Sequence, residues 1–440
     1  MLTLLIAAVF VVSADVFFVF QLGGFTVRAF QVLVLPLILK SVWDSAWGFG
    51  SPYLPLGFKM LVVWVCFIVA FVPNATFLTR NIFYAAWLVF DVLVVLGVTR
   101  LVKTPRQLNV LLCWYIYSFV FSGLFGLLQF GLPLVGLPGL LVQQWWFPEQ
   151  LARINGFTYE PSYYATYMLT GWVLVDYLRY RKIALVRGMR WIAWLITAAL
   201  LLCGSRMGWL MMLAWLALRM YWRMSDHGFA WISRKVVLAS VVPFLLVPYA
   251  LARLHIDSDD LEFLAAGIGT LDTTSHSSGE RFVVFQETLD VFYEHPLIGV
   301  SLGGVATEIG RSRHNAVNDN DAIKDNEGIC TTAEILAASG LIGFIPYFLY
   351  MKRLMWTTIR IKDYSDLGVT VKALGWSLLF LILILQFNET ILRSYVWLHI
   401  GILSAAFGVF VLVRDTRCSV ELPMRTLIGN LVFESPGTVS

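Results

Sequence analysis

The chain has 440 residues, of which 59% are hydrophobic and only 14% charged, and its mean hydropathy is +0.75. Because about a quarter of the residues in a soluble domain are charged, this composition excludes an ordinary water-soluble protein and predicts a chain solvated largely by lipid. The net charge of +4 is small, and the basic residues lie between apolar stretches, which argues against nucleic acid as a partner.

Apolar stretches recur along the whole chain, and a helix that crosses a bilayer needs about 20 such residues. We therefore predict an all-α, polytopic membrane protein with about 12 transmembrane helices. We expect these spans over residues 2–20, 24–40, 57–73, 82–99, 107–131, 162–178, 190–204, 206–222, 236–254, 334–351, 370–388 and 396–413. The first apolar run has no basic residue before it and no small-residue cleavage site, so we interpret it as a retained helix.

The connections between these spans separate by charge. Most basic residues fall in alternate connections: Arg100, Lys103, Arg106, Arg179, Arg181, Lys182, Arg187, Arg190, Arg223, Arg234, Lys235, Lys352, Arg353, Arg360, Lys362, Arg414 and Arg417. The positive-inside rule assigns this face to the cytoplasm and places both termini there, so the opposite face is periplasmic or extracellular. The predicted organisation is transmembrane helices over 1–254, a large periplasmic loop over 255–333, further transmembrane helices over 334–413 and a cytoplasmic tail over 414–440.

The long periplasmic loop is predicted to contain short helices. Ser277 and Glu280 have the spacing of a capping box, and apolar residues follow at helical spacing from Phe282 to Phe292. His295-Pro296 should end this helix. Its apolar stripe favours a helix that lies on the bilayer or caps the transmembrane bundle, and a small packed helix without a catalytic role is the simpler interpretation.

Arginines on the outer face are the feature that most needs an explanation. They are Arg153, Arg206, Arg281, Arg311, Arg313 and Arg393. Arg206 lies in a tight turn between two spans, and Arg393 follows Glu389 by four residues at the outer end of a span, on the same helical face. Any one of these arginines is explained by snorkelling or by a salt bridge to Glu160 or Glu389. Several at the mouth of one bundle favour a phosphate-bearing ligand, which guanidinium groups bind bidentately.

A second group of polar residues precedes a span that begins at Pro161. Glu160 either caps this helix and complements its dipole, or binds sugar hydroxyls or acts as a base. Tyr159, Tyr163 and Tyr164 are interfacial belt residues or stacking surfaces for sugars.

His314 lies beside Arg311 and Arg313 in the long loop, where neighbouring positive charge favours a neutral imidazole that could act as a base. The alternative is a solvated loop histidine. The acidic run that follows, from Asn318 to Glu327, lacks the glycine and the spacing of an EF-hand, so we expect no metal site there.

Taken in order, these segments resemble the superfamily of Wzy-type O-antigen polymerases and lipopolysaccharide O-antigen ligases. The resemblance covers roughly residues 150–350 and rests on the order of several short motifs. The matching motifs are Arg153…Gly156…Glu160-Pro161-Ser162, Ser205-Arg206-x-Gly208, Gly279-Glu280-Arg281 followed by His295-Pro296-Leu297-Ile298-Gly299-Val300, and Gly340-Leu341-Ile342-Gly343.

The resemblance implies an inverting glycosyltransferase that uses an undecaprenyl-diphosphate-linked oligosaccharide on the periplasmic face. It implies that Arg206 and Arg281 hold the diphosphate, with Arg153, Arg313, Arg393, Glu389 and Tyr159 as further substrate-binding candidates. Glu160 and His314 are then the candidate catalytic bases. Since the diphosphate is the leaving group, no metal or other cofactor is expected.

Within the superfamily, two activities compete. In ligases a histidine lies shortly before the Gly-x-x-Gly motif, whereas His314 precedes Gly340 by a long acidic stretch. The Glu160-Pro161-Ser162 form of the first motif is more similar to polymerases of O-antigen or exopolysaccharide, which commonly work with a chain-length regulator protein. A flippase for lipid-linked sugars is a third possibility, but it should carry charged residues deep in several spans, and such mid-span charges are few here: Asp15, Asp91 and Asp176.

Overall fold

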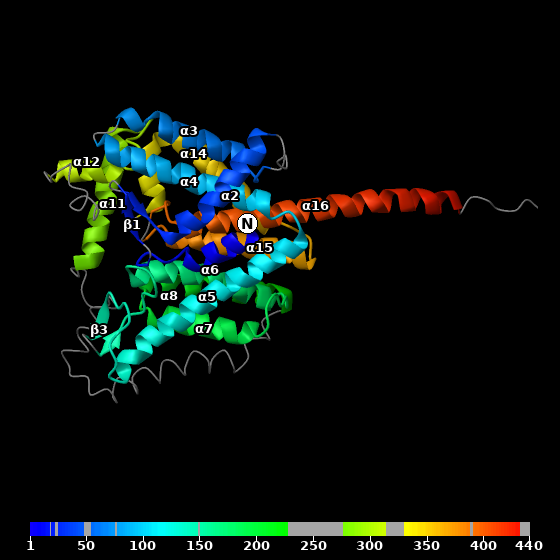
Figure 1. Ribbon diagram of the computed structural model, residues 1–440, viewed down its shortest axis with the longest axis horizontal. Coiled ribbons are helices and arrows are strands. Elements are labelled where there is room, and N and C mark those ends of the chain that lie inside the picture. Colours follow the sequence, from blue (N-terminus) through cyan, green and yellow to red (C-terminus); the bar gives the residue numbers. More distant parts are fainter. Residues whose placement is uncertain are drawn as a thin grey trace, which may run out of the picture.

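The computed structural model describes residues 1–17, 19–22, 25–47, 54–74, 77–147, 150–227, 276–313, 330–387 and 390–431. Helices predominate in this part of the chain, and most of them run side by side in a bundle (Figure 1). They are α1 (Leu2–Val11), α2 (Ala29–Ala46), α3 (Phe58–Ala70), α4 (Leu78–Leu101), α5 (Pro105–Leu134), α6 (Pro161–Tyr180), α7 (Met189–Leu202), α8 (Arg206–His227), α11 (His276–Glu294), α12 (Val305–Ser312), α14 (Thr331–Ile359), α15 (Asp366–Ile384) and α16 (Ser394–Leu431). The strands are β1 (Phe20–Leu22), β2 (Phe25–Val27), β3 (Trp145–Phe147) and β4 (Leu151–Ala152).

Six of the described helices are long and apolar enough to cross a membrane: α2, α4, α5, α14, α15 and the Ser394–Asp415 part of α16. Helices α1, α3 and α7 are apolar but shorter. These helices agree with a mostly helical, multi-pass membrane protein. The predicted count of about 12 spans is not confirmed, and the predicted span 236–254 lies outside the described residues.

The first two predicted spans, 2–20 and 24–40, are wrong at the ends that face each other. Helix α1 ends at Val11, and α2 begins only at Ala29. Between them, β1 pairs antiparallel with β2, so the fold is not strictly all-α. The physical reason is that this segment carries Asp15 and Arg28, whose charges are paired with each other outside the helices.

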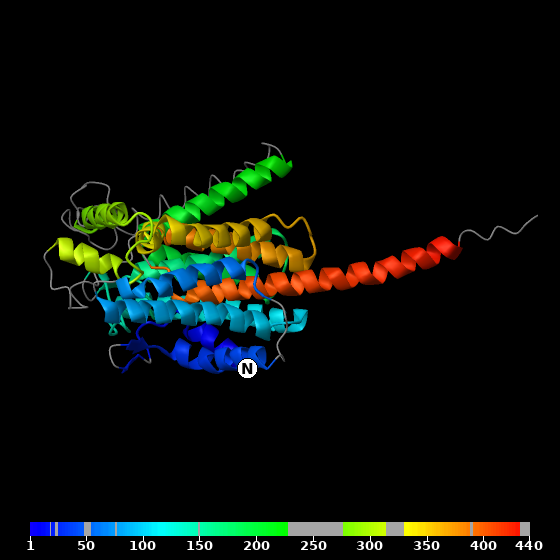
Figure 2. The same cartoon turned by 90° about the horizontal axis from the view of Figure 1, so that it is seen from above.

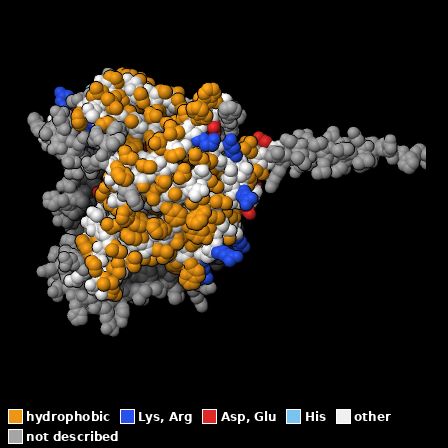
Figure 3. All heavy atoms as spheres, viewed as in Figure 1, with side chains coloured by type: hydrophobic (Ala, Val, Ile, Leu, Met, Phe, Trp, Pro, Cys, Tyr) orange, Lys and Arg blue, Asp and Glu red, His pale blue; other side chains and the backbone are white. Residues whose placement is uncertain are grey.

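The two ends of the bundle differ in character. The two small sheets and helices α11 and α12 lie at one end, and α16 projects beyond the other (Figures 1 and 2). Figure 3 shows hydrophobic side chains over the flank of the bundle and Lys and Arg side chains gathered where α16 leaves it. We call the end with the sheets the sheet end and the opposite one the basic end. An apolar flank that ends in basic side chains is the surface expected where a helical bundle meets one boundary of a bilayer.

The helices pack closely in the middle of the bundle. Helix α16 packs against α4, α15 against α6, and α14 against α3. At Gly171 of α6, an added Cβ would lie 2.3 Å from the ring of Phe119 of α5. Only glycine at this position therefore allows α6 and α5 to come this close. The hydroxyl of Ser377 donates to the carbonyl of Thr170 at 2.6 Å, which joins α15 to α6 by a buried hydrogen bond.

Helix α14 is broken at Gly340, where φ is 57° and ψ is −172°. The segment 296–301 crosses this break and satisfies the backbone groups that the helix leaves open. Val300 N and Ser301 N donate to the carbonyls of Ala337 and Ala338 at 3.1 and 2.8 Å. In return, the backbone N–H groups of residues 341 and 342 donate to the carbonyls of residues 296 and 297 at 2.9 and 3.2 Å. Two motifs that are far apart in sequence therefore form one backbone-paired unit at the sheet end.

The helix predicted in the long loop is confirmed. Helix α11 begins at His276 and ends at Glu294, directly before His295-Pro296. It packs against α14 and α12 and so covers part of the bundle. Phe282 and Tyr293 remain exposed on it, at 60% and 69% of their surface.

Candidate functional site

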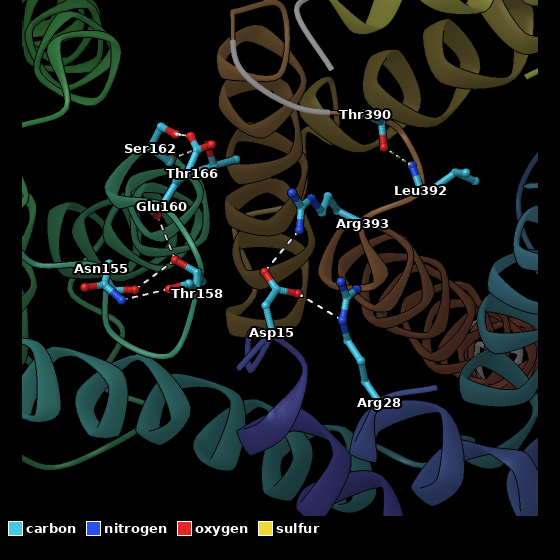
Figure 4. Close-up of polar contacts among 10 residues, drawn as sticks. All are labelled: Asp15, Arg28, Asn155, Thr158, Glu160, Ser162, Thr166, Thr390, Leu392 and Arg393. Atoms are coloured by element: carbon cyan, nitrogen blue, oxygen red, sulfur yellow. Dashed lines mark hydrogen bonds and ion pairs between the residues drawn. The ribbon is translucent and has the colours of Figure 1, made fainter. Parts of the chain in front are cut away.

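A buried carboxylate joins three distant parts of the chain at the sheet end. Asp15 accepts a hydrogen bond from Nη1 of Arg393 at 3.0 Å through Oδ2, and its Oδ1 lies 3.3 Å from Nε of Arg28 (Figure 4). The Asp15 side chain is only 9% exposed, and those of Arg393 and Arg28 are 16% and 27% exposed. One carboxylate therefore holds two guanidinium groups side by side.

Local backbone structure places each of these three residues. Asp15 follows the end of α1, and its backbone N–H donates to the Phe157 carbonyl at 2.9 Å. Arg28 is the extended residue before α2, with its N–H bonded to the Gln31 side chain at 2.9 Å. Arg393 ends the turn that precedes α16. All three lie outside helices, so their side chains can converge from different directions.

Aromatic rings complete this site. The Cζ atom of Arg393 lies 3.9 Å from the centroid of the Tyr163 ring, a cation–π contact. Arg28 and Arg393 line a pocket of about 250 Å³ together with Tyr84, Tyr163 and Ser394. Next to it, Nη2 of Arg80 donates to the Tyr84 hydroxyl at 3.0 Å. The pocket thus combines cationic forks, hydroxyl groups and stacking surfaces, which suits an anion attached to a sugar.

The loop before α6 is held by two buried side-chain amides, those of Asn155 and Gln129. The Asn155 side chain donates to the Thr158 carbonyl at 2.7 Å and accepts from Gln143 N at 3.2 Å. The Gln129 side chain accepts from the N–H groups of Asn155 and Gly156 at 2.9 and 3.0 Å. The loop therefore fixes where α6 begins, and with it Glu160 and Tyr163.

Glu160 occupies the position before α6, but its side chain makes no capping hydrogen bond to the helix backbone. Instead, its Oε2 accepts a hydrogen bond from the Ser162 hydroxyl at 2.9 Å (Figure 4). The side chain of Glu160 is half-buried, whereas that of Tyr159 is exposed. Helix capping alone therefore does not account for Glu160. The Ser162 hydroxyl orients its carboxylate, and Glu160 lies one helical turn before Tyr163, the residue that Arg393 contacts.

At a second place on the sheet end, Arg153 contacts the turn that leads to Arg206. Arg153 donates to the Gln144 side chain at 2.8 Å and to the Gly204 carbonyl at 3.2 Å, and its guanidinium lies over the Trp146 ring at 5.1 Å. Arg206 begins α8 two residues after Gly204 and is half-buried. Hence Arg153 ties the β3–β4 sheet to the turn that carries Arg206.

The remaining predicted site residues are placed differently. Arg313 forms a two-pronged ion pair with Glu287, with contacts of 2.8 and 2.6 Å that join α12 to α11. Arg281 belongs to α11. His314 and Glu389 lie outside the described residues. The predicted helical i,i+4 relationship of Glu389 to Arg393 is wrong, because Arg393 precedes α16 and is not helical.

Comparison with known protein families identifies part of the chain. Residues 191–348 match the O-antigen ligase family model. Over these residues the match confirms the resemblance to the O-antigen ligase and polymerase superfamily that the sequence motifs indicated, and the motif from Arg153 to Ser162 lies outside it. No curated protein matches the chain.

The match to the O-antigen ligase model runs from the start of α7 to the second half of α14. It includes Arg206, Arg281, Arg313 and the break at Gly340. Asp15, Arg28, Glu160 and Arg393 lie outside it. The ion-pair cluster is therefore a feature of this chain that the structure adds to the family match.

Sequence reasoning missed Arg28 and misjudged Asp15, which it placed within a span. A signal was present, because each is a charged residue in an otherwise apolar run, and such residues are costly unless they are paired. Their partner could not be identified, since Asp15 and Arg393 are 378 positions apart.

Proposed function

We propose that the protein transfers a glycan from a polyprenyl diphosphate to an acceptor hydroxyl at the sheet end of the bundle. The observation that carries this proposal is the pair Arg28 and Arg393, bridged by Asp15 and lining one pocket with Tyr163. Guanidinium groups bind phosphate oxygens bidentately and stay charged at physiological pH. A lipid-linked diphosphate presents its anionic group at the end of the membrane-spanning bundle, where this pocket lies.

In the proposed step, the acceptor hydroxyl oxygen forms a bond to the anomeric carbon of the donor sugar. The bond between that carbon and the diphosphate oxygen breaks, and the polyprenyl diphosphate leaves with the bonding electrons. The arginines stabilise the charge that develops on the leaving oxygen. Attack from the opposite side inverts the anomeric centre. Because the diphosphate is itself the leaving group, the proposal includes no nucleotide, metal or other cofactor.

The hydroxyl proton passes to a base, for which Glu160 is the first candidate. Its carboxylate is held by Ser162 at 2.9 Å, and Tyr163 follows it on the first turn of α6. A carboxylate so placed lies on the same helix turn as the ring that Arg393 covers. His314 is the second candidate, as the resemblance to ligases suggests.

We further propose that the acceptor is another lipid-linked repeat unit, so that the protein is a polysaccharide polymerase of O-antigen or exopolysaccharide synthesis. The Glu160-Pro161-Ser162 motif favours this activity. The match to the O-antigen ligase model favours the alternative, in which a finished glycan passes to a lipid or protein acceptor. For a polymerase, a chain-length regulator is a further expected partner. The proposed location is the periplasmic side of a bacterial inner membrane, with both termini in the cytoplasm.

The test uses purified protein, its host's undecaprenyl-diphosphate repeat unit as the only glycan, and separation of products by size. A ladder of longer lipid-linked glycans is expected for a polymerase. A product that appears only after an acceptor lipid or protein is added would indicate a ligase. Unchanged glycans under both conditions would contradict glycosyl transfer altogether and leave a flippase as the better hypothesis. The control variant is Arg106→Lys, which changes an exposed residue at the basic end and should give the same products as the wild type.

A further inference from the structure

A second pocket lies at the basic end of the bundle, whereas the site around Arg393 lies at the sheet end. It has a volume of about 270 Å³ and lies between the end of α6, α8, the end of α14 and the start of α15. Its charged lining residues are Arg181 and Lys372, and its other walls are mostly aromatic. Among the described residues no carboxylate lines it, so two cations face a shared cavity without an opposite charge in its lining.

The aromatic wall of this pocket is well packed. The rings of Trp222 and Trp376 meet edge to face with 4.9 Å between their centroids. The Tyr177 ring contacts Trp222 in the same way at 5.9 Å. Opposite them, Arg181 lies over the exposed ring of Tyr364 at 5.3 Å. Stacking on that ring holds the guanidinium at the mouth of the pocket.

The nearest buried carboxylate does not neutralise these cations. Asp176 accepts hydrogen bonds from Arg219 and from Nε1 of Trp215, the latter at 2.8 Å, and Arg179 lies 3.9 Å from it. Its charge is therefore compensated within α6 and α8. Arg219 and Arg223 both lie over the Tyr180 ring at 5.6 Å, so the aromatic wall beside the pocket also contacts guanidinium groups. The local field favours an anion.

We infer that this pocket binds the phosphate group of an anionic phospholipid. Its place supports a lipid rather than a soluble ligand, because its lining residues lie at the end of α14 and the start of α15, two helices long and apolar enough to cross a membrane. Basic pockets between transmembrane helices on the positively charged side suit anionic headgroups. A volume of about 270 Å³ accommodates a headgroup but not a whole lipid, so the acyl chains would lie along the flank. Arg181 and Lys372 contact the phosphate, and the aromatic residues surround the glycerol.

The experiment measures lipid retention by the full-length protein in native mass spectrometry, after exchange into defined mixtures of phosphatidylglycerol and phosphatidylethanolamine. The wild type should retain phosphatidylglycerol preferentially. Arg181→Gln and Lys372→Gln should each weaken this preference about fivefold, as expected for the loss of one basic contact. Lys103→Gln is the matched control, because it removes one exposed charge at the same end but outside the pocket.

A further variant, Tyr364→Ala, tests whether a loss of lipid retention could come from misfolding. This ring is 76% exposed, so its removal should leave the bundle intact while Arg181 loses its stacking surface and lipid retention falls. Equal retention of both lipids by the wild type, or an equal loss in the Lys103→Gln control, would overturn the inference. The same mass spectra would be recorded with glycerol 3-phosphate or inorganic phosphate in place of lipid. Retention of either compound to the same extent as phosphatidylglycerol would overturn the assignment to a lipid.

Discussion

The guanidinium of Arg393 covers the ring of Tyr163 at 3.9 Å and at the same time donates to Asp15 at 3.0 Å. The first contact reaches α6 and the second reaches the segment after α1, so one side chain connects the beginning, the middle and the end of the chain. An arginine fixed on two sides keeps its orientation when an anion arrives, which reduces the cost of ordering it.

Arg393→Lys should lower kcat for glycan transfer by roughly 10²-fold, because an ammonium cannot reproduce the fork that stacks on Tyr163 and binds phosphate oxygens. Initial rates with the lipid-linked repeat unit measure this effect. Arg313→Lys is the matched control, since Arg313 is engaged by Glu287 on the α11–α12 surface. Equal losses in both variants would refute the distinction between the two arginines.

Asp15→Asn should destabilise the protein by about 3 kcal/mol, because it leaves two adjacent guanidinium groups without their shared countercharge. The thermal unfolding midpoint in detergent measures this change. Arg28→Gln should also destabilise, and the double variant should lose less than the sum of the two single changes because the residues share one interaction. Asp44→Asn, which breaks the exposed Lys40–Asp44 pair, should change the midpoint little. Strict additivity of Asp15→Asn and Arg28→Gln would argue against the ion pair.

Glu160→Gln should lower kcat by roughly 10²-fold or more if this carboxylate is the base, with substrate binding retained. Ser162→Ala should produce a smaller loss, because it removes only the hydroxyl that orients the carboxylate. His314→Ala in parallel separates the two candidate bases. Full activity of Glu160→Gln together with an inactive His314→Ala would assign the base to the histidine.

Arg206→Ala should abolish product formation while the protein remains in the membrane. Arg206 starts α8 within the segment that matches the O-antigen ligase model, and the resemblance assigns it to the diphosphate. Membrane fractionation and size analysis of the glycans measure both parts of this prediction. Wild-type activity in this variant would limit the diphosphate site to the cluster around Arg393.

Gly340→Ala should destabilise the fold by more than the backbone cost of about 1–3 kcal/mol for an alanine with a positive φ and an extended ψ. An added Cβ would lie 2.3 Å from the Leu297 carbonyl carbon and so would force apart the two paired motifs. Gly136→Ala is the control, because Gly136 also has a positive φ, of 78°, but open space around its Cα. The difference in unfolding temperature between the variants isolates the steric term. No difference would contradict the pairing of 296–301 with α14.

Local patterns in the sequence determined much of the architecture. Apolar runs predicted the positions of the long helices, because every backbone group in a bilayer must be bonded within its own helix. The apolar spacing from Phe282 to Phe292 and the His295-Pro296 pair predicted α11 and its end, whereas the helix begins at His276, before the expected cap at Ser277. The outer arginines indicated an anion site, since a cluster of positive charge is unexpected on that face.

Only the tertiary structure decided which partner each of those arginines has. Arg313 pairs with Glu287, Arg153 holds the Gly204 turn, and Arg393 shares Asp15 with Arg28. These outcomes depend on contacts between segments far apart in the chain, whose side-chain directions follow from helix packing and from the loops between helices. Periodicity and spacing describe one segment at a time, so they could place charges at the sheet end but not choose their partners.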